Sequence, residues 1–222
     1  MSKIIFVADL FTEQYVGGAE LTTEALIEAC PFDYIKLNSK DVTIETLQKF
    51  HDCFWIFGNF TQLQTQLVPS IVGNIRYAVL EYDYKFCQYR SIDLHKKETG
   101  NDCDCFQQIH GKLVSAFFHG ANTVFWMSEN QLDRYAQVFP FLLKDDEGSR
   151  QIVLSSVFKQ STFHKIKELR DKHKEKNGKF VVLGSDSWIK GKDLAIDYCA
   201  KNDMDYDIIW DKSYDETLEK NY

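Results

Sequence analysis

Positive charge is in deficit along this 222-residue chain, which carries 26 lysines and arginines against 33 aspartates and glutamates, a net charge of −7. Sequence-independent binding to nucleic acid requires a basic face that neutralises phosphates. The one dense basic run, Lys165 to Lys179, fits the solvated face and exit of a helix better than a binding surface. The composition therefore predicts a protein that does not bind nucleic acid.

Long hydrophobic runs are absent as well, and no stretch approaches the roughly 18–20 apolar residues of a membrane span. The first apolar run, Lys3 to Ala8, is short, is followed by Asp9 and lacks a signal-peptide cleavage pattern. The six cysteines do not show the spacing of a disulfide framework. These absences predict no transmembrane segment and a cytoplasmic, reducing location.

Candidate strands and helices alternate along the whole chain. Several strands are continuous apolar runs, such as Phe54-Trp55-Ile56-Phe57, which suits parallel strands buried on both faces. We expect eight strands, at 3–8, 33–37, 53–58, 76–82, 123–127, 151–154, 179–184 and 206–210. The expected helices are 19–30, 128 to about 140, 162–176, 191–201 and one that begins at Ser213. The alternation predicts an α/β fold with a Rossmann-like parallel sheet and helices on both of its faces.

A glycine pair, Gly17-Gly18, separates the first expected strand from the first expected helix. Glycine lets a ligand approach the backbone closely, and the partly positive end of the helix favours an anion there. The segment therefore suits an anion or a sugar hydroxyl. The alternative is an ordinary strand–loop–helix turn, because short glycine motifs also match by chance.

Three segments in order carry a resemblance to a known group of enzymes: 17–20, 151–158 and 181–191. Together they resemble glycosyltransferases of the GT-B fold, especially the retaining group with a Gly-Gly loop near its start. The resemblance implies an acceptor-side N-terminal domain with a linker helix over residues 1–175. Residues 176–222 would then form the first part of a second Rossmann-like domain, which binds the nucleotide-sugar donor.

The activity implied is transfer of a sugar from a nucleotide-sugar to an acceptor, which is a sugar, a lipid or a protein, with no metal or other cofactor. Enzymes of this group carry a carboxylate-rich motif later in the second domain, whereas this chain stops at Tyr222. We therefore expect a C-terminally truncated chain that is incomplete as a catalyst. The alternative is a non-catalytic binding or assembly module, which keeps the fold and associates through the edge of its incomplete second domain.

The resemblance also assigns donor-binding residues. Lys190-Gly191 matches a lysine–glycine pair of the group, in which the lysine stabilises the leaving nucleotide diphosphate. Ser185 stands near the position of a family arginine, so hydrogen bonds from serine would replace one cation. Gly17 and Gly18 would offer backbone N–H groups where the two domains face each other. The alternative for Lys190 is a surface lysine beside a turn.

Asp83 is the candidate catalytic residue, because it follows the fourth expected strand at the edge of the sheet where α/β proteins bind ligands. Relatives in the resembling group often carry a histidine near this position, and this chain has none there. Retaining transfer needs little from an enzymic base, because the donor phosphate can accept the acceptor proton. The alternative is a strand-end charge paired with Lys85 or Arg90.

Cys103-Asp104-Cys105, with His95 and His110 nearby, raises the question of zinc. Structural zinc sites usually separate their cysteines by about two to four residues, and here the gap is one residue. We therefore expect two incidental thiols in a long loop and no metal site.

Overall fold

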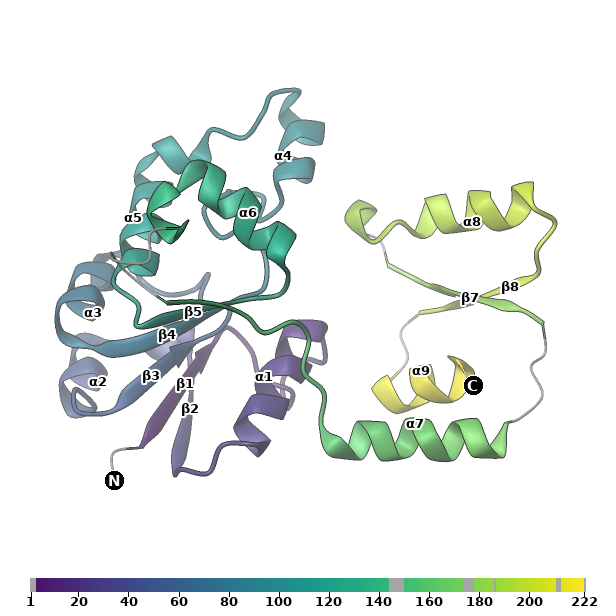
Figure 1. The fold of residues 1–222 in the computed structure, drawn as a ribbon, viewed down its shortest axis with the longest axis horizontal. Helices are drawn as coiled ribbons and strands as arrows, with labels where there is room; N and C mark the ends of the chain where they lie inside the picture. The colour runs from purple at the N-terminus through teal and green to yellow at the C-terminus, as the bar shows by residue number, and fades with distance from the viewer. Residues whose placement is uncertain (1–2, 144–149, 174–177, 186, 211–212, 222) are drawn as a thin grey trace. The chain divides into compact units, whose positions relative to one another are not determined.

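The computed structural model of the chain describes residues 3–143, 150–173, 178–185, 187–210 and 213–221. The chain divides into two compact units, Met1–Val157 and Phe158–Tyr222 (Figure 1). The domain boundary predicted at 175/176 lies outside the described residues. The predicted linker helix is helix α7, Gln160–Lys172, which falls within the second unit.

A six-stranded sheet forms the centre of the first unit, in the order β2-β1-β3-β4-β5-β6. Every neighbouring pair is parallel, and the strand order reverses at β1. The strands are β1 (Ile4–Ala8), β2 (Tyr34–Asn38), β3 (Phe54–Phe57), β4 (Arg76–Glu81), β5 (Thr123–Trp126) and β6 (Arg150–Val153). The six strands predicted from apolar runs in this unit are confirmed, with ends that differ by a residue or two.

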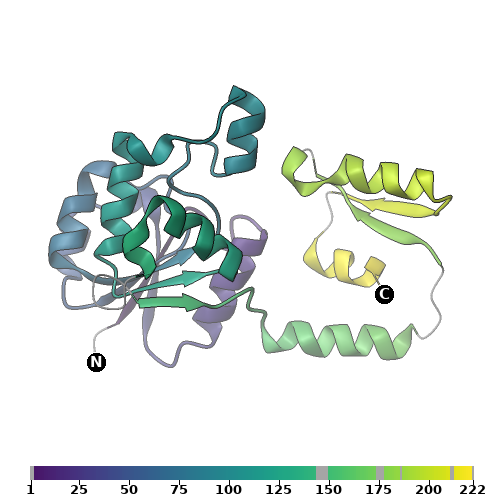
Figure 2. The ribbon, with the colours of Figure 1, turned by 45° about the horizontal axis from the view of Figure 1, so that its top comes forward.

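Helices cover both faces of this sheet (Figure 2). One face carries α1 (Gly18–Glu28), which packs its Ile27 against Phe6 and Ala8 of β1. The alternate residues of β1, Ile5 and Val7, belong to a larger core on the other face. The helices of that face are α2 (Ile44–Lys49), α3 (Val68–Asn74), α5 (Ile109–His119) and α6 (Glu129–Val138). The predicted Rossmann-like α/β fold is therefore confirmed.

Aromatic side chains fill the larger core. Phe117 of α5 packs against Phe57 of β3 and Tyr77 of β4, with ring centroids 5.1 Å and 4.8 Å apart. The hydroxyl of Tyr77 donates to the carbonyl oxygen of Phe117 at 2.6 Å, so this buried polar atom keeps a partner. Full burial of a phenylalanine side chain such as that of Phe117 stabilises the fold by roughly 1.5–3 kcal/mol.

The segment between β4 and α5 contains structure that the sequence pattern did not show. Helix α4 (Ile92–Thr99) has Ser91 as its N-cap, and the Ser91 hydroxyl accepts from the N–H of Leu94. Its C-cap is Gly100, with φ +74°. Helices α2, α3 and α5 were also missing from the predicted set. The 3₁₀ turns of the described residues are Ser39–Asp41, Thr65–Leu67, Cys105–Gln107, Pro140–Leu143 and Trp188–Lys190.

The second unit contains a two-stranded parallel sheet, β7 (Phe180–Leu183) and β8 (Tyr206–Ile209). Its helices are α7, α8 (Lys192–Lys201) and α9 (Tyr214–Asn221). Both strands and the three helices were predicted within a few residues, from apolar runs and cap residues. No helix in the described ranges of either unit has the length and apolar character needed to cross a membrane.

Candidate functional site

Polar side chains converge at the carboxyl edge of the six-stranded sheet, and Asp9 is the first of them. Its carboxylate accepts hydrogen bonds from the hydroxyls of Ser39 and Thr61 and from the backbone N–H of Gln62. Burial alone would raise the pKa of Asp9, but these hydrogen bonds outweigh it and lower the pKa. Asp9 therefore ties the ends of three strands together as a carboxylate.

A buried ion pair lies at the end of β4. The Nζ atom of Lys85 lies 2.8 Å from Oε2 of Glu81, and both side chains are almost fully buried. The hydroxyl of Tyr135 on α6 donates to Oε1 of Glu81 at 2.9 Å. Burial raises the pKa of Glu81 to about 7, and the nearby ammonium of Lys85 opposes that shift. This network holds the end of β4 against α6.

The candidate catalytic residue Asp83 is paired with Arg90, which also lies 3.9 Å from a carboxylate oxygen of Asp9. Lys85 is 3.8 Å from the other oxygen of Asp83. The alternative interpretation of Asp83, a strand-end charge paired with Lys85 or Arg90, therefore has its ion pairs present. Nevertheless, Oδ1 of Asp83 and Nε of Arg90 are buried without a hydrogen-bond partner among the residues that the structure describes. Such orphaned atoms need an explanation, and a ligand can supply it.

Arg90 adopts a backbone conformation that disfavours most side chains, with φ +54°. A non-glycine residue in this region costs roughly 1–2 kcal/mol. Its side chain reaches Asp83 and donates from Nη2 to Asn59 at 2.8 Å, so several contacts maintain the strained position. Strain of this kind concentrates at functional sites.

A cavity of about 150 Å³ lies beside this edge in the first unit. One part of its wall is polar and includes Thr61, Lys85 and Arg90. The rest is mostly apolar and is formed by Phe60, Leu63, Val68, Leu113, Val114 and Phe117. The cavity therefore suits a small ligand that has one apolar part and one part with hydroxyl or anionic groups.

The predicted glycine pair lies at the start of α1, where Gly17 is the N-cap in an extended conformation. A Cβ atom at Gly17 would lie 2.5 Å from Oε2 of Glu20, whereas a Cβ atom at Gly18 would meet nothing within 4 Å. Burial raises the pKa of Glu20, although hydrogen bonds from the backbone of Glu20 and Gly17 act in the opposite direction. The Glu20 carboxylate thus occupies two backbone donors at this helix end, those of Gly17 and Glu20, and a Cβ atom at Gly18 would face open space.

Of the predicted donor-binding residues, Gly17 and Gly18 lie in the first unit, whereas Ser185, Lys190 and Gly191 lie in the second unit after β7. A cavity of about 210 Å³ there is lined by residues that include Ser185, Ser187, Gly191 and Lys192. Ser185 accepts a hydrogen bond from the N–H of Ser187 at 3.2 Å, which leaves its own hydroxyl hydrogen for another acceptor. Lys190 is exposed, and the cation among the lining residues is its near neighbour Lys192.

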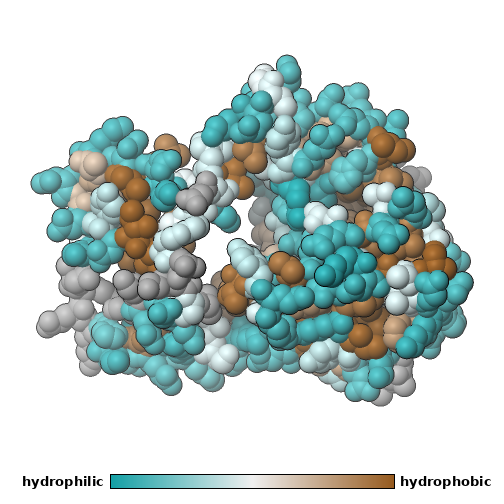
Figure 3. All heavy atoms as spheres, turned by 180° about the vertical axis from the view of Figure 1, so that it is seen from behind, coloured by the Kyte–Doolittle hydropathy of each residue, from teal (hydrophilic) through white to brown (hydrophobic). Residues whose placement is uncertain are grey.

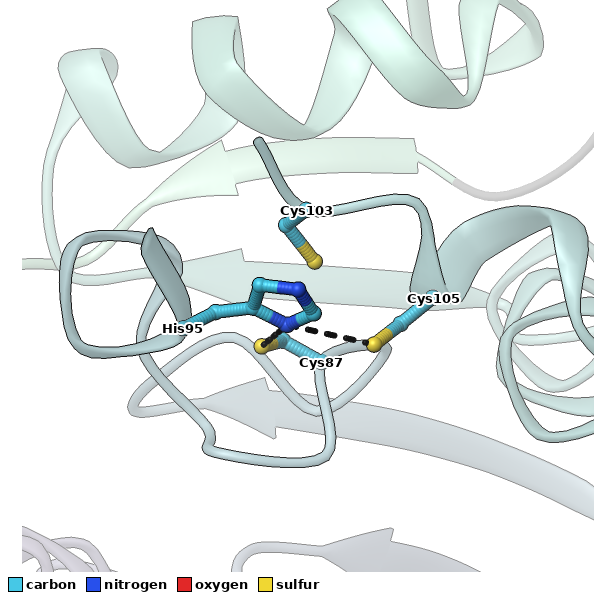
Figure 4. Close-up of side chains that lie close together, drawn as sticks. All are labelled: Cys87, His95, Cys103 and Cys105. Carbon is cyan, nitrogen blue, oxygen red and sulfur yellow. Dashed lines mark hydrogen bonds between the residues drawn. The ribbon is translucent and has the colours of Figure 1, made fainter. Parts of the chain in front are cut away.

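Three cysteines and a histidine meet in the segment between β4 and α5 (Figure 4). The ligand atoms of Cys87, His95, Cys103 and Cys105 all lie within 4.8 Å of one another. Burial raises the pKa of the Cys87 thiol and raises the pKa of Cys103 to about 12. His110, which the sequence placed near this group, instead contacts the carbonyl oxygen of Lys85 through Nε2 at 2.7 Å.

The sequence pattern does not single out Cys87, which lies eight positions before His95 and outside any short cysteine motif. It does not single out the contact of Glu81 with Tyr135 either. Cys87 meets His95 because the segment after β4 turns back on itself, and Glu81 meets Tyr135 because α6 packs over the end of β4. The expectation of no metal stays a prediction, and the gathered ligands give a reason to test it.

No protein-family description matches this chain. No curated protein matches it either. The resemblance to glycosyltransferases therefore stays a prediction, and the function has to be argued from the site.

Proposed function

We propose that this chain binds a nucleotide-sugar and belongs to a GT-B-like glycosyltransferase. The observation that carries the proposal is the cavity at the start of α8, where Ser185, Ser187 and Gly191 lie at the carboxyl end of a parallel strand. Hydroxyl groups, backbone N–H groups and a helix N-terminus together suit a diphosphate. Lys192 in the wall and the exposed Lys190 supply positive charge near the same loop.

Gly191 gives this loop its shape. Its φ of +71° places it in the left-handed region, and it is both the end of the Trp188–Lys190 turn and the N-cap of α8. Glycine adopts this conformation without the cost that a side chain adds. The turn therefore brings the first residues of α8, 192–194, to the wall of the cavity, where a phosphate would accept from their N–H groups.

The first unit supplies the acceptor side of the proposal. Its cavity joins an apolar wall to Arg90, and the neighbouring Asp83 carries a buried oxygen, Oδ1, that has no hydrogen-bond partner among the described residues. A sugar hydroxyl could donate to Oδ1 of Asp83, while the apolar wall would pack against a sugar ring or an attached apolar group. In this role Asp83 orients the acceptor, and the donor phosphate accepts the proton.

Equilibrium binding of UDP, GDP and their sugars to the full chain tests the donor site. We expect one nucleotide to bind, and a Ser185→Ala/Lys190→Ala/Lys192→Ala variant to bind it at least about tenfold more weakly, since the lost charged contacts together should weaken binding by about 1.4 kcal/mol or more. Lys201→Ala, at the far end of α8, is the matched control and should bind normally. Equal affinity in both variants, or no binding of any nucleotide, would contradict the proposal.

A second candidate is the non-catalytic assembly module, and one observation favours it. The second unit exposes several large apolar side chains, and apolar surface is visible on it at the left of Figure 3. They include Phe180, Leu183, Leu194, Ile208 and Trp210. Surfaces of this kind mark interaction sites. Light scattering that shows self-association, together with no nucleotide binding, would favour this candidate over sugar transfer.

A further inference from the structure

We propose that Cys87, His95, Cys103 and Cys105 form a structural zinc site. This inference is independent of the proposed sugar transfer. Three thiols and one imidazole are a donor set that Zn²⁺ prefers in four-coordinate structural sites. Cys87 and Cys105 are buried, His95 is almost fully buried and Cys103 is half-buried, so the site is closed to a substrate.

The separations match the edges of a zinc tetrahedron. With Zn–S bonds of about 2.3 Å and Zn–N bonds of about 2.1 Å, a sulfur and the nitrogen lie roughly 3.6 Å apart and two sulfurs roughly 3.8 Å apart. Nδ1 of His95 lies 3.7 Å from Sγ of Cys87 and 3.5 Å from Sγ of Cys105. All four ligand atoms lie within 4.8 Å of one another (Figure 4). In an iron–sulfur cluster the four ligands are divided over two or more iron atoms, so some of their separations exceed the edge of a single tetrahedron.

A backbone group lies beside one of the sulfurs. The thiol of Cys87 lies 3.5 Å from the carbonyl oxygen of Ser91, the N-cap residue of α4, so this sulfur is held next to the helix that carries His95. Zinc binding would release the thiol protons to solvent and leave a centre with three thiolates, one neutral imidazole and a net charge of −1.

The site would join three separate pieces of the segment between β4 and α5. Cys87 lies in the turn after β4, His95 lies in α4, and Cys103 and Cys105 lie at the turn before α5. The carbonyl oxygen of Cys87 accepts from the N–H of Arg90 at 2.9 Å. The metal would therefore hold both the long segment and the strained turn that directs Arg90 toward Asp83.

The test is the metal content of the full chain, expressed without a histidine tag and dialysed against metal-free buffer. We expect about one zinc per chain by elemental mass spectrometry, and less than about a tenth of that in Cys105→Ser and in Cys87→Ser. Cys53→Ser removes a buried cysteine of the same unit outside the cluster and is the matched control, which should keep its zinc.

A second measurement keeps the test decisive if the serine variants do not fold. Wild-type protein stripped by a chelator should lose thermal stability, regain it with Zn²⁺, and with Co²⁺ develop the visible absorption of a tetrahedral cobalt–thiolate centre. A folded wild-type protein that takes up neither ion would overturn the proposal. An intact mass that shows a disulfide within the cluster in freshly purified protein would also overturn it.

Discussion

The two units of this chain use the same architecture with very different degrees of burial. In the first, the strands contribute fully buried aromatic side chains such as Trp55, Phe57 and Tyr77, and even the ion pair of Glu81 with Lys85 is inside. In the second, the buried apolar side chains of the described residues are Leu169, Val182, Cys199 and Ile209. The first unit has a core that can fix side chains in place, whereas the second presents an open loop on a small sheet. Buried polar side chains with defined partners, such as Glu81 with Lys85, are therefore found in the first unit.

The largest effect is expected from breaking the buried ion pair. Lys85→Met should lower the free energy of unfolding by about 3–5 kcal/mol, because it leaves the Glu81 carboxyl buried without its cation. The double variant Glu81→Gln/Lys85→Met should recover most of this loss. In the second unit, Lys165→Met removes exposed pairs with Asp215 and Glu219 and should leave the denaturant midpoint unchanged. Equal losses in Lys85→Met and Lys165→Met would contradict the contrast between the units.

The core of the first unit can be tested in a similar way. Phe117→Ala should cost about 3–5 kcal/mol, since it opens a cavity among Phe57, Phe60 and Tyr77. We expect chemical denaturation to show two transitions, of which this substitution moves only the one at higher denaturant concentration. Val182→Ala, in β7, should move only the transition at lower denaturant concentration. A single transition that both variants shift would show that the units unfold together.

The pH dependence of stability gives a smaller effect with a defined sign. The pKa of Glu81 is raised by burial to about 7 from an ordinary 4.5, so the folded state retains this proton more strongly than the unfolded state. Stability should therefore fall as the pH rises from 4.5 to 7, and then level off. Glu81→Gln, which resembles the protonated acid, should cost less at pH 8 than at pH 5 when the denaturant midpoints are compared. A cost that is the same at pH 5 and pH 8 would show that the carboxyl is ionised over this whole range.

The smallest effects concern the two glycines at helix starts. Gly18→Ala meets open space at ordinary φ and should change stability by no more than about 0.5 kcal/mol. Gly191→Ala has φ +71° and should cost about 1 kcal/mol through backbone strain. Differential scanning calorimetry measures both changes in stability. If the glycine pair faces a ligand, Gly18→Ala should also weaken sugar or nucleotide binding while its stability stays normal, and unchanged binding would reduce Gly18 to a simple turn residue.

Local patterns were sufficient to predict the strands of both units. Runs such as Phe54-Trp55-Ile56-Phe57 are strands because apolar, β-prone residues gain from burial on both faces. Ser128 predicted the start of α6 because its hydroxyl caps the N–H of Gln131 three residues later. Helix α2 was missed although Thr43 and Thr46 form a reciprocal cap, because six residues are too few to show helical periodicity.

The amino-acid sequence by itself determined the alternation of strands and helices, the parallel sheet and the polar edge after β4, because hydrophobic periodicity and capping act over a few neighbouring residues. Only the tertiary structure decided which side chains meet. Arg90 lies against Asp83, Tyr135 against Glu81, and Cys87 beside His95 and Cys105, at separations along the chain that no local period links. These contacts depend on how the loop after β4 closes over the sheet, and the free energy of that closure comes from burial across the whole unit.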